Sequence, residues 1–215
     1  MEMLERNPAA KVPKPILEPT TPRVLTVAEC EWLLRTAEEH DAELVGFLAL
    51  AMFAGLRPES ELGRLTLADI GADHVTVSTA AKTRRRRLVR LSGNLVAFLV
   101  SWRALSGELV PVNSKRRFER IRRLAGFAQW PQDALRHSFV SYHYVLHGEA
   151  DTAAQAGHSA QMLHEHYRGL VSRDDAERFF GIMPRAEPYA PRVTARPEIG
   201  RERAQAMARK RWSAR

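Results

Sequence analysis

The chain has 215 residues, of which 45% are hydrophobic and 27% charged, and its formal net charge is +8. This length allows one domain with a full core, and no apolar run reaches the roughly 18 residues that a membrane span needs. The single cysteine, Cys30, excludes a disulfide within the chain and a multi-cysteine zinc site, and it favours a reducing, cytoplasmic location. The N-terminus lacks the apolar segment of a signal peptide.

Arginine-rich segments at 84–87, 115–123 and 201–215 carry much of the positive charge. Such an excess indicates a polyanionic partner, most often nucleic acid, although a solvated basic surface explains the charge alone equally well. Aromatic residues make up only 7% of the chain and are not interleaved with the basic runs. This pattern favours contact with the backbone of a duplex over stacking on single strands.

The first predicted elements are a tail and two helices. Residues 1–24 hold five prolines and are expected to form an extended linker or tail. The sequence Thr-Val-Ala-Glu starting at Thr26 is a capping-box pattern, so a helix should run from there to about residue 40. A more apolar helix over 42–55 is expected in the core, followed by one or two helical turns over 57–64.

The middle of the chain changes character at residues 74–91, where β-branched residues flank a polar stretch. This pattern predicts two or three short antiparallel strands with a turn near Lys82 to Arg85. After Ser92 the pattern is again helical, and the expected helices are 93–105, 114–124, 133–147, 151–156, 160–167 and 173–180. An extended stretch over 181–199 and a basic helix over about 200–212 are expected to end the chain.

Three segments carry candidate functional residues at defined spacings. They read 54-AGLRPESELGRL-65, 80-AAKTRRRRLVRL-91 and 133-DALRHSF-139, the last followed by 157-GHSAQMLHEHY-167. His158 lies 22 residues after Arg136, and Tyr167 lies nine residues after His158. Over roughly residues 24–180, this order and spacing resemble the catalytic domain of the tyrosine recombinases, or phage integrases.

The resemblance implies a mainly helical α+β fold with a small three-stranded antiparallel sheet. It also implies an enzyme that breaks and rejoins strands of duplex DNA through a 3′-phosphotyrosyl intermediate. Arg57 and Arg136 would hold the non-bridging phosphate oxygens, because a guanidinium group can donate two hydrogen bonds while staying charged. Tyr167 would attack the phosphorus, Lys82 would protonate the departing 5′ oxygen, and His158 would donate a hydrogen bond to the phosphate.

The sequence departs from the family pattern at two positions. Asp133 stands where the family has a histidine that assists proton transfer from the tyrosine. A carboxylate can act as a base, but it would lie near an anionic phosphate, so altered pH dependence or a lower rate is expected. The usual acid three positions after the first arginine is replaced by Glu59 and Glu61, and Glu61 lies on the same helical face as Arg57. His137 is expected to give structural support.

The resemblance further implies a double-stranded DNA partner, no membrane, a homotetramer on DNA and a monomer when free. The expected domains are a tail over 1–24, the catalytic domain over 25–182, and a Pro-containing extension with a basic helix over 183–215. The resemblance also implies an N-terminal DNA-clamping domain in full-length relatives, which we expect to be absent from this sequence. Two alternatives stay open, namely a type IB topoisomerase-like enzyme and a non-catalytic DNA-binding remnant of an integrase.

The histidines raise the question of a metal site. His143 and His147 are spaced i,i+4, and His164 and His166 flank Glu165. Neither pair has the His-Glu-x-x-His arrangement of zinc proteases. The sequence therefore predicts no metal, and the implied chemistry needs no cofactor.

Overall fold

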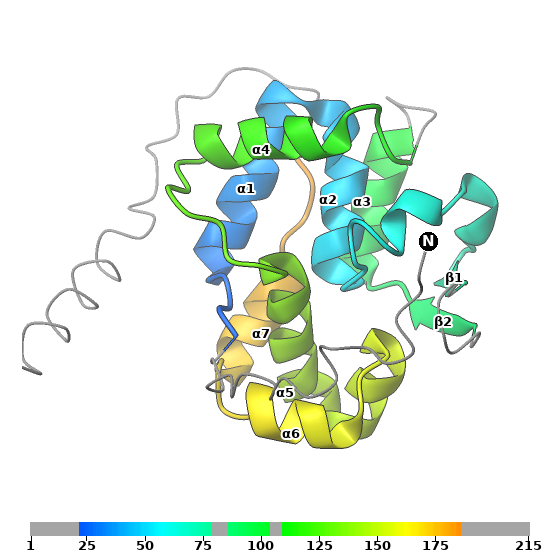
Figure 1. The fold of residues 1–215 in the computed structure, drawn as a ribbon, viewed down its shortest axis with the longest axis vertical. Helices are drawn as coiled ribbons and strands as arrows, with labels where there is room; N and C mark the ends of the chain where they lie inside the picture. The colour runs from blue at the N-terminus through cyan, green and yellow to red at the C-terminus, as the bar shows by residue number, and fades with distance from the viewer. Residues whose placement is uncertain (1–21, 79–85, 104–108, 186–215) are drawn as a thin grey trace, which may run out of the picture.

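A computed structural model describes the fold over residues 22–78, 86–103 and 109–185 (Figure 1). In these ranges the chain forms seven α-helices, three short 3₁₀ helices and one antiparallel sheet. The helices are α1 (Val27–His40), α2 (Val45–Phe53), α3 (Gly93–Arg103), α4 (Ser114–Leu124), α5 (Ala134–Ala156), α6 (Ala160–Tyr167) and α7 (Arg173–Phe180), and the strands are β1 (His74–Val77) and β2 (Arg87–Arg90).

Helix α1 begins at the predicted capping box. The Thr26 hydroxyl accepts a hydrogen bond from the backbone N–H of Glu29, and the Glu29 carboxylate accepts one from the backbone N–H of Thr26. This reciprocal pair satisfies two backbone donors that a helix start otherwise leaves free. The helix ends at His40, as the sequence predicts.

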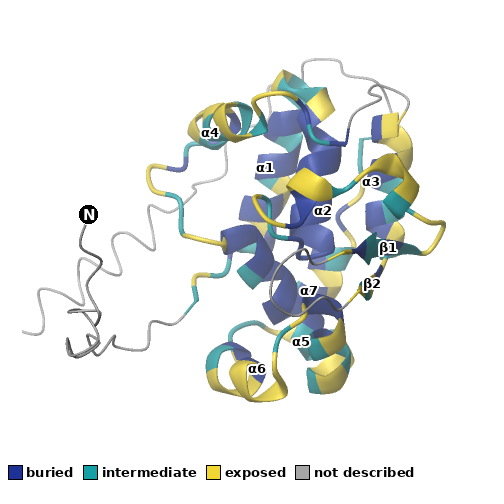
Figure 2. Ribbon diagram, turned by 45° about the vertical axis from the view of Figure 1, so that its right-hand side comes forward, coloured by how far each residue is buried: buried dark blue, intermediate teal, exposed yellow. Residues whose placement is uncertain are grey.

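Helix α2 forms the centre of the core, and all nine of its residues are buried. Figure 2 shows this helix in the colour of buried residues, with α1 and α3 on either side of it. The Trp102 ring of α3 lies so close to Gly46 of α2 that a Cβ there would be 2.6 Å from it. The predicted helix over 42–55 is therefore confirmed, except that Ala42–Leu44 form a 3₁₀ turn.

The sheet is small and lies at one edge of the helical body (Figure 1). Strands β1 and β2 pair antiparallel, and the buried Val75 and Val89 face each other. In the described ranges the sheet has two strands instead of the expected three, with Ile70 forming only an isolated bridge to Val75. The expected turn near Lys82 lies outside the described residues.

Helix α5 joins two predicted helices into one bent element. Its backbone is non-helical at Gly148, where φ is 76° and ψ is −176°. Only glycine adopts this conformation without strain, so the kink has a clear sequence cause. The second half of α5 then ends at Gly157, which has the left-handed conformation typical of a helix C-terminus.

Helices α4, α6 and α7 have the bounds that the sequence predicts. The expected tail over 1–24 and the extension over 183–215 lie almost entirely outside the described residues. Of the helices that are described, none combines the length and hydrophobicity required to cross a membrane.

Candidate functional site

The loop after α2 brings Arg57 against α5. Gly55 has a φ of +62°, and a Cβ at this position would lie 2.3 Å from the Phe139 ring. Glycine is therefore required both for the turn and for the close approach of the loop to α5. The Arg57 side chain leaves this loop with 40% of its surface exposed, so it is available to a ligand.

Glu61 is a buried carboxylate that joins two arginines. It accepts hydrogen bonds from the backbone N–H of Arg57 at 2.9 Å and from Arg57 Nη1 at 3.0 Å. Arg87 of β2 donates to both of its oxygens, at 2.6 and 2.9 Å. The expectation that Glu61 orients Arg57 agrees with this geometry.

The charge on Glu61 is strongly favoured. Burial by itself raises its pKa, but hydrogen bonds from Arg87 and from the backbone of Arg57 outweigh burial and lower the pKa to about 2. Arg136 Nη1 lies 3.9 Å from the same carboxylate. Three guanidinium groups thus surround one carboxylate, which leaves a local excess of positive charge for an anionic ligand.

Arg136 is almost fully buried near the start of α5. Its guanidinium donates to the carbonyl oxygen of Gly55 at 2.6 Å and to that of Ala156, at the far end of α5. Burial, and then the nearby charge of Arg57, lower the pKa of Arg136 to about 10. The group remains a cation at neutral pH, and two backbone carbonyls fix its position.

His158 follows the left-handed Gly157 and lies against Arg136, with its Nε2 3.0 Å from Arg136 Nη2. A guanidinium has no acceptor, so Nε2 must accept this bond and Nδ1 must carry the proton. This Nδ1 is buried and has no hydrogen-bond partner among the described residues. Burial, and then the Arg136 charge, lower the pKa of His158 to about 3. His158 is therefore a neutral imidazole with one donor to offer.

Tyr167 is the last residue of α6 and is buried beside the two histidines of the site. Its ring is stacked near that of His158 at 5.9 Å between centroids. Its hydroxyl lies 2.6 Å from Nδ1 of His137. Burial raises the pKa of Tyr167, although the charge of Arg136 acts in the opposite direction. The phenol is thus protonated at neutral pH and needs a base to react.

His137 contacts the candidate nucleophile directly, which the sequence interpretation missed by assigning it structural support. It follows Arg136 on α5, and burial lowers its pKa, while the Asp133 charge opposes this shift. A neutral imidazole can accept the phenol proton. The signal for this role was present in the sequence as the Arg-His pair, but only the packing of α6 on α5 reveals the contact.

Asp133, the residue in place of the family histidine, is exposed at the N-cap of α5. It has a left-handed φ of 51°, and among the described residues its side chain makes no capping bond. Its carboxylate influences the pKa values of His137 and Tyr167, after the larger effect of burial on each. It therefore lies in electrostatic range of the phenol and His137. Lys82, the remaining predicted residue, lies outside the described residues.

Arg87 is a second residue that the sequence did not single out. It belongs to the arginine-rich segment 84–87. The structure directs Arg87 inward, where it binds Glu61 and donates from Nε to the carbonyl of Gln155 at 3.1 Å. Composition alone could not separate this half-buried arginine from its neighbours in the run.

The structure therefore gathers four of the predicted residues into one cluster of neighbouring side chains. They are Arg57, Arg136, His158 and Tyr167. Two cations and a neutral donor stand beside a phenol whose hydroxyl contacts an imidazole base. This arrangement can bind a phosphate group and place a nucleophile next to it.

The chain is similar to known proteins both in sequence and in fold. No protein-family model matches the chain. The chain is 25% identical over 216 aligned positions to the tyrosine recombinase XerC of Erythrobacter litoralis (strain HTCC2594), covering 89% of this chain and 68% of that protein.

Solved structures with a similar fold include the XerA recombinase, with a TM-score of 0.60, 19% identity, and coverage of 78% of this chain and 68% of that one. A lambda integrase dimer bound to a COC′ core site has a TM-score of 0.55 and 18% identity, with 68% and 61% coverage. The mainly helical fold with its small antiparallel sheet is the one these proteins share. By sequence and by fold, the chain is thus similar to tyrosine recombinases and phage integrases.

Proposed function

We propose that this chain breaks and rejoins strands of duplex DNA through a covalent 3′-phosphotyrosyl intermediate, as the catalytic part of a site-specific recombinase. The observation that carries the proposal is the convergence of two guanidinium groups, an imidazole and a phenol in one cluster of side chains. The excess of positive charge on the chain supports a DNA partner.

The arginines would bind the scissile phosphate. Arg136 is fixed by the carbonyls of Gly55 and Ala156, and Arg57 is oriented by Glu61. Preorganised cations of this kind stabilise the negative charge that builds up on phosphorus-bound oxygens in the transition state. His158 lies against Arg136 and would serve as a further donor to the phosphate.

The nucleophilic step would form a bond between the Tyr167 oxygen and phosphorus and break the bond from phosphorus to the 5′ oxygen. The phenol proton would pass to Nδ1 of His137, which lies 2.6 Å from the hydroxyl. The departing 5′ oxygen would take a proton from Lys82. In this scheme His137 takes the phenol proton, a step that the family assigns to the histidine replaced here by Asp133. Asp133 would then orient or polarise the imidazole of His137.

A nicked suicide duplex tests the proposal, because loss of the short strand beyond the nick traps the covalent intermediate. Since the target sequence is unknown, the duplexes should be a pool with a randomised core. We expect a protein–DNA adduct on denaturing gels that Tyr167→Phe abolishes, while Tyr144→Phe, a half-buried tyrosine of α5, leaves it intact.

The presence of Asp133 favours one rival, a non-catalytic DNA-binding remnant. Retardation of DNA in native gels without any adduct, at every pH tested, would support the remnant. An adduct that persists in Tyr167→Phe would contradict the assigned nucleophile. Assembly as a homotetramer on DNA is part of the proposal, and a lambda integrase tetramer bound to a Holliday junction provides the precedent.

A further inference from the structure

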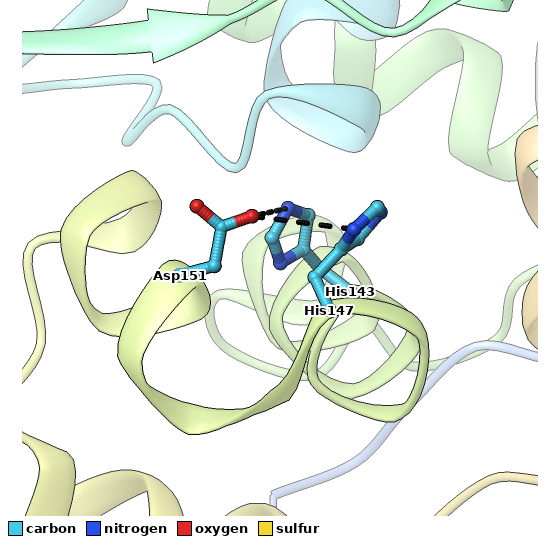
Figure 3. A group of neighbouring side chains, drawn as sticks. All are labelled: His143, His147 and Asp151. Atoms are coloured by element: carbon cyan, nitrogen blue, oxygen red, sulfur yellow. Dashed lines mark ion pairs between the residues drawn. The ribbon is translucent and has the colours of Figure 1, made fainter.

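A second group of side chains lies on α5, beyond the cluster described above. His143 and His147 project from the first half of the helix, one turn apart, and Asp151 follows the kink at Gly148. Figure 3 shows the carboxylate of Asp151 directed at both imidazoles. Without the kink, the three residues would follow one another along a straight helix.

The three potential ligand atoms all lie within 4.8 Å of one another. Asp151 Oδ2 is 4.0 Å from Nε2 of His143 and 4.0 Å from Nδ1 of His147. These separations are too long for direct hydrogen bonds. Two nitrogens and an oxygen thus face a common point without bonding to one another.

We propose that His143, His147 and Asp151 bind a divalent transition-metal ion, with Zn²⁺ as the best match. Zinc binds imidazole nitrogen and carboxylate oxygen at about 2.0–2.2 Å, so ligand atoms around one tetrahedral ion lie roughly 3.3 Å apart. Asp151 therefore has to approach each imidazole by roughly 0.7 Å to reach that geometry, and the three ligand atoms, now within 4.8 Å of one another, have to draw together. Its side chain is 32% exposed, which leaves room for this shift.

The hydrogen bonds around His143 and Asp151 suit metal binding. Nδ1 of His143 lies 2.7 Å from the hydroxyl of Thr152, whose oxygen can accept a hydrogen bond from Nδ1–H and leave Nε2 free to bind a metal. Arg90 binds Oδ1 of Asp151 at 3.1 Å and so leaves Oδ2 directed at the histidines. Second contacts of this kind orient ligands in established metal sites.

The proposed ion would keep one coordination position open to solvent, because His147 is 44% exposed. It would also bridge the kink at Gly148. The segment beyond the kink carries the carbonyls of Gln155 and Ala156, which hold Arg87 and Arg136. Metal binding is therefore expected to stiffen the support of the arginine cluster without entering it.

The test is a titration of the chelator-treated chain with zinc chloride by calorimetry, and with Co²⁺ by visible absorption. We expect one ion per chain, a raised Tm on zinc addition that a chelator reverses, and imidazole nitrogen shifts in NMR spectra for His143 and His147. His147→Ala and Asp151→Asn each remove a ligand and should weaken binding about tenfold or more.

The matched control is His40→Ala, which removes a similarly exposed histidine at the end of α1 and should bind the ion as the unaltered chain does. Circular dichroism of each variant without metal verifies that it folds. Absence of saturable binding would overturn the proposal. Equal affinity in the unaltered chain, His147→Ala and Asp151→Asn would also overturn it, because the ion would then lie elsewhere.

Discussion

The arginines of the candidate site are fixed by a buried carboxylate and by backbone carbonyls, whereas the Tyr167 hydroxyl is positioned through the imidazole of His137. The arginine half of the site comes from a loop, a strand and a long helix. The tyrosine half of the site lies at the end of α6, an eight-residue helix. The arginine half is thus anchored by Glu61 and by backbone carbonyls, whereas the Tyr167 ring packs in a second, smaller hydrophobic cluster with Phe139 and Leu163.

The largest effect is expected from Glu61→Gln, which leaves the guanidinium groups of Arg57, Arg87 and Arg136 without their shared counter-charge. Breaking a buried ion pair from one side typically costs about 3–5 kcal/mol. Urea denaturation should show a loss of this size. Glu59→Gln removes an exposed carboxylate two residues away, and it should change stability by less than about 0.5 kcal/mol. Equal effects of the two substitutions would contradict the proposed role of Glu61.

Acid should remove the stabilisation that the ionised Glu61 carboxylate gives to the arginine half of the site. The pKa of Glu61 is lowered to about 2 in the folded chain, so its stabilisation is complete above its unfolded pKa of about 4.3 and is lost as the pH falls toward 2. The difference corresponds to roughly 3 kcal/mol. The measurement is the free energy of unfolding against pH for the unaltered chain and Glu61→Gln. The gap between the two curves should close over this interval.

His158 should make the free energy of unfolding depend on pH over a higher range than Glu61 does. Its pKa is lowered to about 3 in the folded chain, so its contribution is complete above the unfolded value of about 6.5 and declines below it. His158→Gln should therefore flatten the pH dependence between these values. An unchanged slope would show that His158 is not held neutral in the folded chain.

On the nucleophile side, His137→Gln should slow formation of the phosphotyrosyl adduct about 100-fold or more, which is typical of losing a general base. The expected loss follows from the 2.6 Å contact between Nδ1 and the Tyr167 hydroxyl. Single-turnover kinetics on the suicide duplex measure it. DNA affinity should remain, since the arginines are untouched. A normal rate in His137→Gln would transfer the role of base to Asp133.

The smallest effect is expected from Tyr167→Phe on stability. It removes one hydrogen bond to His137, worth about 1 kcal/mol, and keeps the buried ring. Tyr144→Phe serves as the control for a half-buried phenol. A loss as large as that of Glu61→Gln would mean that the two halves of the site are equally built into the core.

The sequence predicts best what is decided locally. The capping box at Thr26 and the helix over 114–124 are visible along the chain, and the structure agrees with them. Each depends on neighbouring residues or on the period of a helix.

Contacts between distant segments could not be predicted in this way. Arg87 and Glu61 are 26 residues apart, and His137 and Tyr167 are 30 apart. Their pairing depends on how β2 and α6 pack on α5, for which a single sequence carries no signal. The position of Asp151 was hidden for the same reason, because it follows from the backbone conformation of Gly148.

The absence of a side chain at Gly55 determines how closely its loop packs against α5. Because no side chain separates the loop from the Phe139 ring, the Gly55 carbonyl comes within 2.6 Å of Arg136. Any larger residue would push loop and helix apart and withdraw that oxygen from its guanidinium partner. The position of the Arg136 guanidinium is thus determined by the smallest residue in the chain.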